Sequence, residues 1–152
     1  MIHLESVTRD NIEELIELSV REDQQSFVST VAESLAQAYV YSENAYPFAV
    51  YEDDILVGFI MMGYYEVKQY YTLWKFLIDY RYQNKGYGRQ ALVLGLEYIK
   101  EKFNPPDIYT GVVPGNTVAK DLYKSVGFED TGLIECGMEE MKLKYPMTIK
   151  IN

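Results

Sequence analysis

Residues 83–88, with the sequence QNKGYG, have the residue types of an anion-binding turn. The two glycines lack a Cβ atom, so a ligand can approach the backbone amides closely. If a helix begins here, its first turn offers unpaired N–H groups with a partial positive charge, which suits a phosphate or diphosphate. The candidate binding residues of this turn are Gln83, Asn84, Lys85, Gly86, Tyr87, Gly88 and Arg89, of which Lys85 and Arg89 add positive charge.

A strand and a helix are expected on either side of the turn. Upstream, residues 70–80 alternate between two sides and are rich in aromatic and branched side chains, which favours a strand. Downstream, Leu92, Leu96 and Ile99 recur at helical spacing. The dinucleotide fingerprint does not fit, because it needs a third glycine where Ala91 stands, and the Walker loop needs Gly-Lys before Ser or Thr. A turn that uses glycine only for tightness remains the alternative reading.

The whole sequence predicts one mixed α/β domain, residues 1–152, with helices on the faces of a sheet. Strands are expected at residues 2–7, 47–52, 55–65, 70–80, 108–113, 128–135 and 139–143, and helices at 12–19, 31–39, 87–103 and 117–126. The apolar spacing predicts that Ile16, Tyr39 and Val118 lie on the inward faces of their helices. The tail from Pro146 has no clear pattern.

The formal net charge of −9 argues against a nucleic-acid partner, because phosphates require a basic face. An acidic field attracts cationic small molecules, although acidity also serves solubility. No stretch approaches the roughly 18 unbroken apolar residues of a membrane span, so we expect no membrane partner and a cytoplasmic protein. With His3 and Cys136 as its only residues of their types, the chain is not expected to bind a metal.

A second motif lies further along the chain, and with the first it resembles the GNAT family of N-acetyltransferases. It reads Asn116-x-x-Ala119-x-x-Leu122-Tyr123-x-x-x-Gly127-Phe128, and the first reads Gln-x-x-Gly-x-Gly. The resemblance spans roughly residues 1–144 and looks closest to bacterial spermine, spermidine or diamine N-acetyltransferases. It implies a mostly antiparallel sheet of about seven strands, flanked by about four helices and splayed at the central strands.

The resemblance also implies acetyl-coenzyme A as cosubstrate. The glycine turn would hold its pyrophosphate, and the main chain of Phe76, Leu77 and Ile78 would contact its pantetheine arm and thioester. Asn116 would bond the cofactor from the next loop. Tyr123 matches the family tyrosine that faces the coenzyme sulfur, and would protonate the departing thiolate. The alternative for Tyr123 is a core tyrosine.

The acceptor implied by this reading is a small cationic amine such as spermidine or spermine. Candidate substrate-binding residues are Glu22, Asp23, Phe27, Glu66 and Asp79, and the general base is expected among Glu22, Glu66 and Asp79. Asp79 has an alternative structural role as a cap at the end of its strand. Other readings are a different acceptor (an aminoglycoside, an amino acid or a protein N-terminus) and a module that binds acetyl-coenzyme A without turnover. A homodimer is compatible with the family.

Overall fold

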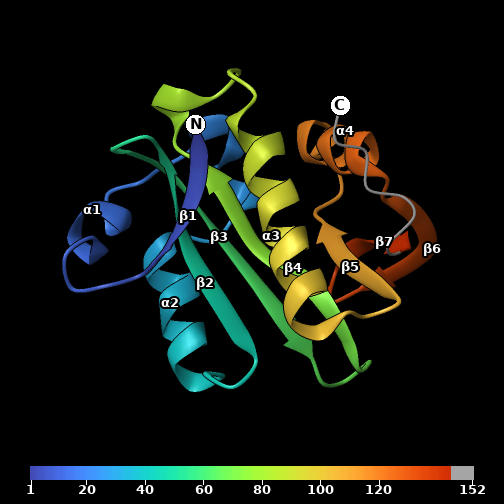
Figure 1. Ribbon diagram of the computed structural model, residues 1–152. Helices are drawn as coiled ribbons and strands as arrows, with labels where there is room; N and C mark the ends of the chain where they lie inside the picture. Colours follow the sequence, from blue (N-terminus) through green and yellow to red (C-terminus); the bar gives the residue numbers. More distant parts are fainter. Residues whose placement is uncertain (145–152) are drawn as a thin grey trace.

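The protein, as a computed structural model that describes residues 1–144, is built on one mixed sheet with helices on both faces (Figure 1). The elements in chain order are β1 (Ile2–Ser6), α1 (Ile12–Ile16), the 3₁₀ helix η1 (Glu22–Phe27), α2 (Val31–Val40), β2 (Ala45–Glu52), β3 (Ile55–Tyr65), β4 (Tyr70–Ile78), the 3₁₀ helix η2 (Tyr80–Tyr82), α3 (Tyr87–Phe103), β5 (Asp107–Val112), α4 (Thr117–Val126), β6 (Glu129–Glu135) and β7 (Met138–Lys144). The tail from Pro146 and the end of the single domain lie outside the described residues.

The sheet has the strand order β1-β2-β3-β4-β5-β7-β6 within the described part of the chain. Neighbouring strands are antiparallel except β4 and β5, which run parallel because α3 connects them across one face of the sheet. Figure 1 shows α3 crossing in front of the sheet. The predicted mixed, mostly antiparallel sheet with four α-helices is therefore confirmed.

Two apolar layers hold the helices against the sheet. On one face, buried side chains of α3 and α4 pack with β3, β5 and β7, and on the other α1 and α2 pack with β2 and β3. Gly95 lets α3 approach the sheet closely, because a Cβ atom there would stand 2.8 Å from Cδ1 of Ile60 and 3.1 Å from Sδ of Met62. This close approach fixes α3 over the centre of the sheet.

The pairing of β4 with β5 is short. Only Tyr71, Thr72 and Leu73 of β4 have register partners in β5 among the described residues, and the two strands then diverge (Figure 1). On its other edge β4 pairs with β3 along its length, with an irregularity at Met61/Met62 that leaves Trp74 without an opposite residue. The splay between the central strands that the sequence predicts is therefore present.

Three inward assignments on the helices are wrong: Ile16, Tyr39 and Val118 are exposed. Helix α2 packs against the sheet through Val31, Leu35 and Ala38. Tyr39 lies at the edge of this packed face, and its side chain is exposed. Val118 lies in the first turn of α4 and is 68% exposed. Apolar residue type alone therefore misplaced positions at the margins of the helical faces.

Candidate active site

A cavity of about 540 Å³ opens where β4 and β5 diverge. Its walls come from the end of β4, the start of α3, the inner side of α4 and the η1 segment. It is lined by twelve of the residues selected from the sequence: Phe27, Phe76, Leu77, Ile78, Gln83, Asn84, Gly86, Tyr87, Gly88, Arg89, Asn116 and Tyr123. Residues from distant parts of the chain thus meet in one space, which we call the first cavity.

The glycine turn has the backbone shape of an anion-binding loop. Asn84 and Gly86 have positive φ angles of 64° and 83°, and α3 begins at Tyr87. A side chain at Gly86 would be strained by this left-handed conformation, so glycine suits the position. The unpaired amides of the first helical turn therefore start at the rim of the first cavity.

Gln83 ties the turn to its surroundings. Its side-chain amide donates hydrogen bonds to the carbonyl oxygen of Ile78 at 2.9 Å and to Oε1 of Gln24 at 3.0 Å. These bonds connect the end of β4, the glycine turn and η1. The side chain of Gln83 is therefore engaged within the protein, and it holds the turn in place rather than projecting freely into the cavity.

Tyr123 and Asn116 face the same cavity from α4 and its N-terminus. Tyr123 is only 7% exposed, and burial raises the pKa of its phenol, which keeps the hydroxyl protonated at neutral pH. Asn116 caps α4, because its Oδ1 accepts a hydrogen bond from the amide of Ala119 at 3.3 Å. Its side-chain NH₂ group is the part that could still serve a ligand.

A second cavity, of about 550 Å³, lies beside the first. The two share a wall at the point where β4 and β5 separate, formed by Leu73, Trp74, Thr110, Gly111 and Met138. The second cavity has an aromatic and acidic lining that includes Tyr41, Tyr64, Tyr65, Tyr70, Glu66, Glu135 and Glu140. The two cavities are therefore neighbours at the β4/β5 splay.

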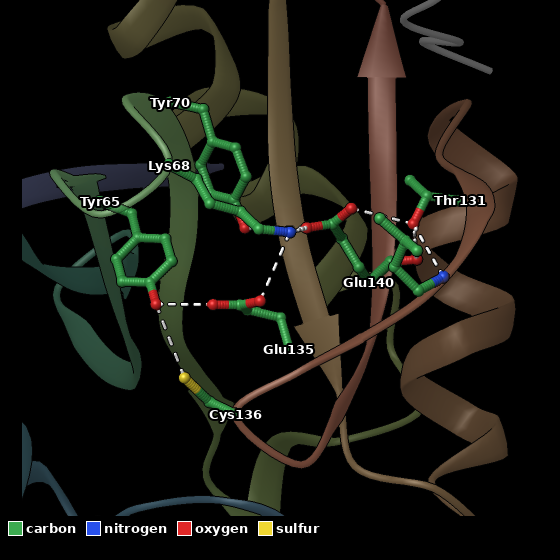
Figure 2. Close-up of polar contacts among 8 residues, drawn as sticks. Tyr65, Lys68, Tyr70, Thr131, Glu135, Cys136 and Glu140 are labelled. Atoms are coloured by element: carbon green, nitrogen blue, oxygen red, sulfur yellow. Dashed lines mark hydrogen bonds and ion pairs between the residues drawn. The ribbon is translucent and has the colours of Figure 1, made fainter.

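The carboxylate of Glu140 is the most buried charge of the second cavity, with the residue 4% exposed (Figure 2). It accepts hydrogen bonds from the Tyr70 hydroxyl at 3.1 Å, the Lys68 ammonium at 3.1 Å and the Thr131 hydroxyl at 2.9 Å. Burial would raise the pKa of Glu140, but these bonds outweigh it and hold the pKa below its usual range. Glu140 is therefore an anion at neutral pH.

The comparison with known families agrees with this geometry. The sequence profile of the Acetyltransferase (GNAT) family matches residues 10–128. The chain belongs to this family. The two sequence motifs that suggested it, one at the start of α3 and one on α4, both lie inside the matched region and line the first cavity.

Two curated relatives cover nearly the full chain. The spermine/spermidine N(1)-acetyltransferase of Bacillus subtilis strain 168 is 29% identical over 152 residues, with 94% of this chain and 97% of that protein covered. The probable spermine N(1)-acetyltransferase of Bacillus subtilis subsp. natto strain BEST195 is 28% identical with the same coverage. The two alignments thus cover nearly the whole length of both relatives.

Solved structures share the fold at lower identity. The spermidine N-acetyltransferase of Vibrio cholerae, in complex with CoA and spermine, has a TM-score of 0.74 at 19% identity, with 94% of this chain and 95% of that chain covered. The PaiA N-acetyltransferase of Thermoplasma acidophilum, in complex with coenzyme A, has a TM-score of 0.71 at 20% identity, with coverages of 95% and 99%. Both support the GNAT fold of the chain.

The five other residues selected from the sequence, Glu22, Asp23, Glu66, Asp79 and Lys85, lie outside the first cavity. Glu22 and Asp23 are exposed on η1 and line neither cavity, because Phe27 and Gln24 form the inner side of that segment. Lys85 is exposed at the tip of the glycine turn and also lines neither. Glu66 lines the second cavity, where it accepts a hydrogen bond from the side-chain amide of Asn44.

Asp79 does not reach either cavity, and the structure favours the capping role that the sequence left open. The residue is 0% exposed. Its carboxylate accepts hydrogen bonds from the backbone amide of Ser19 at 3.0 Å, and from the amide and Nε of Arg81 at 3.0 and 2.8 Å. Burial alone would raise the pKa of Asp79, but these bonds lower it overall. The assignment of Asp79 to the acceptor or to proton abstraction is therefore corrected.

Replacing Asp79 by Asn tests this structural role. We expect the free energy of unfolding at neutral pH to fall by about 1–3 kcal/mol, because a charge-assisted bond with Arg81 is lost from a buried site. The folded pKa of Asp79 lies below the unfolded value, so this stability exists above pH of about 4 and is lost on acidification. Urea titrations should show that the difference in the free energy of unfolding between wild type and variant becomes smaller as the pH falls. A gap that is independent of pH would contradict the role.

Several site residues carried no signal in the sequence. Lys75 of β4 lines the first cavity and donates a hydrogen bond to Oγ of Ser29 at 2.8 Å, and burial lowers the pKa of its ammonium. Glu135 and Glu140 belong to the closing hairpin, for which the sequence predicts only two strands. Nothing in the local pattern of that hairpin separates a carboxylate facing a cavity from one facing water.

Within residues 1–144, no helix has the length and apolar character needed to span a bilayer. In the same residues, no three His, Cys, Asp or Glu side chains gather in a way that would hold a metal ion.

Proposed function

We propose that the protein transfers the acetyl group of acetyl-coenzyme A to a primary amine of a polyamine such as spermidine or spermine. The observation that carries this proposal is the pair of cavities that share a wall at the β4/β5 splay. One cavity begins at a helix N-terminus with a glycine turn, which suits a diphosphate, and the other is acidic and aromatic, which suits an organic cation.

The first cavity fits the coenzyme. A Cβ atom at Gly88 would lie 3.6 to 3.8 Å from Leu122, Ile78 and Phe76, so this glycine is not required by packing within the protein. Gly88 lines the first cavity together with these three residues, so a ligand there would lie close to it. We assign the pyrophosphate to the amides of residues 84–89, and the pantetheine arm to the unpaired edge of β4 at Phe76, Leu77 and Ile78. The thioester would then lie beside Tyr123.

The second cavity fits the acceptor amine. Carboxylates attract the ammonium groups of a polyamine, and tyrosine rings pack against its methylenes and contribute cation–π attraction. Both curated relatives carry spermine in their names, which agrees with such a ligand. The acceptor therefore approaches the shared wall from the side opposite the coenzyme.

Acetyl transfer requires that the acceptor ammonium lose a proton, since a primary amine has a pKa of about 10.4 and only about one molecule in a thousand is neutral at pH 7. Of the three bases considered from the sequence, Glu66 is the one that lines the acceptor cavity. We assign proton acceptance to Glu66, directly or through water. Tyr123 then donates its proton to the thiolate that leaves when the carbon–sulfur bond breaks.

The test is thiol release. Purified protein is mixed with acetyl-coenzyme A and a panel of amines, and free thiol is followed with a chromogenic reagent. We expect rapid release with spermidine or spermine, and slow release with neutral or anionic amines such as amino acids. Coenzyme binding without thiol release on any amine would favour the non-catalytic module.

A homodimer also stays a prediction, which sedimentation equilibrium would check.

A further inference from the structure

An ammonium group of the protein contacts two of the carboxylates that line the second cavity. Lys68, from the turn between β3 and β4, places its Nζ 3.1 Å from Oε2 of Glu140 and 3.4 Å from Oε1 of Glu135 (Figure 2). Both carboxylates line the cavity. The protein therefore contains a primary ammonium bound between two cavity carboxylates, in the manner expected for one end of a polyamine.

The carboxylates around this ammonium are held in place without Lys68. Glu140 also accepts hydrogen bonds from Tyr70 and Thr131, and Glu135 accepts one from the Tyr65 hydroxyl at 2.7 Å. Tyr70 is stacked on the ring of Tyr109 with centroids 3.9 Å apart, which fixes its orientation. The acceptor groups would thus keep their positions if the lysine left.

Lys68 reaches the two carboxylates from a partly exposed position. Its side chain is 32% exposed, and its neighbour in the turn, Val67, is exposed. A lysine side chain has four flexible methylenes, so its head group can move into water at low cost. The Lys68 head group also neutralises one charge where Glu135 and Glu140 supply two. Lys68 is thus an exchangeable cation, and Glu135 and Glu140 are the fixed anions that bind it.

We propose that Glu135 and Glu140, with Tyr65 and Tyr70, form a seat for the distal ammonium of the acceptor, and that Lys68 fills this seat until the acceptor displaces it. This inference rests on the proposed function, because it takes the second cavity as the acceptor site. It selects acceptors with a second ammonium group, since a monoamine has nothing to exchange for Lys68. It also means that the apparent affinity for polyamines is reduced by competition with Lys68.

The proposal predicts opposite changes in the KM for spermidine in two variants. Lys68→Met keeps the apolar stem but removes the competing charge, so the KM for spermidine should fall by about three- to tenfold. Glu135→Gln removes half of the seat's charge, so the KM for spermidine should rise by about tenfold, as loss of one charge-assisted contact predicts. A purely structural role of the Lys68 ion pairs predicts instead that both variants impair the enzyme.

The matched ligand is a monoamine analogue of spermidine, in which the internal amine is replaced by a methylene group and one terminal ammonium by a methyl group. Its KM should change less than about twofold in either variant, because it cannot fill the seat. Lys102→Met and Glu129→Gln serve as control proteins, since each makes the same charge change at an exposed position that lines neither cavity. If the KM values of spermidine and its analogue changed equally in these variants, or if neither KM changed, the inference would be overturned.

Calorimetric titration of the same proteins with spermidine and its analogue keeps this test separate from the test of catalysis. If no amine supports thiol release, the proposed function fails, yet a spermidine Kd that tightens in Lys68→Met and weakens in Glu135→Gln still supports the seat. If turnover occurs but spermidine and its analogue have the same Kd in all variants, the seat is wrong and the proposed function stands.

Discussion

Replacing Tyr123 by Phe is expected to lower kcat for acetyl transfer by about ten- to thousandfold, toward the lower end of the roughly 10²- to 10⁴-fold that a positioned general acid supplies. The phenol is buried in the first cavity, and its raised pKa keeps the proton in place until the thiolate develops. A phenol with a pKa of at least about 10 is a weaker acid than a thiol of about 8.5, so proximity to the sulfur must aid the transfer. Steady-state kinetics with spermidine would measure the loss.

The affinity for coenzyme A should change little in this variant, because Phe keeps the ring and its packing near Phe128, with ring centroids 5.9 Å apart. Tyr98→Phe is a matched control, since the Tyr98 hydroxyl contacts Lys102 on the outer part of α3 and lines neither cavity. Undiminished turnover in Tyr123→Phe would remove the acid role and leave Tyr123 as a core residue.

Replacing Gly88 by Ala is expected to separate ligand binding from folding. The new Cβ would stand 3.6 Å from Leu122 and 3.7 Å from Ile78, which are ordinary contact distances, so the fold should accept it. Stability should stay the same or rise by up to about 1 kcal/mol, because alanine is the better helix former. Coenzyme A should nevertheless bind about ten- to hundredfold more weakly, since an added methyl group at the ligand surface costs about 1–3 kcal/mol.

Isothermal titration with coenzyme A and thermal melts of the same preparations would measure both effects. Gly95→Ala is the informative comparison, because its Cβ would lie 2.8 Å from Cδ1 of Ile60 and should destabilise the protein. Its coenzyme affinity should remain normal in the folded fraction. If Gly88→Ala bound coenzyme A as tightly as wild type, the glycine would serve only the tightness of the turn.

The two motifs were readable from the sequence because each depends on local chemistry. Positive φ angles at Asn84 and Gly86, helix capping by Asn116 and the left-handed end of α4 at Gly127 follow from the residue at that position and its immediate neighbours. The nearly continuous apolar run of β3 and the regular apolar spacing in α3 likewise indicated their boundaries. The family, the order of the elements and most of the first cavity followed from these signals.

The sequence carries little information on which way a charged side chain points. Asp79 was a candidate for the acceptor, but contacts with Ser19 and Arg81 enclose it, and the first of these partners is 60 residues away in the sequence. Glu22 and Asp23 stand on a polar connection whose inner and outer sides cannot be told apart by residue type.

The sequence by itself therefore determined the local shapes: the glycine turn, the caps, the strand and helix periods, and with them the membership in the GNAT family. The tertiary structure alone decided which charged groups share a cavity. Glu140 becomes a buried anion because Lys68, Tyr70 and Thr131 reach it from other strands and turns. Burial and pairing of a charge are properties of contacts between distant segments, and no local pattern of residues encodes them.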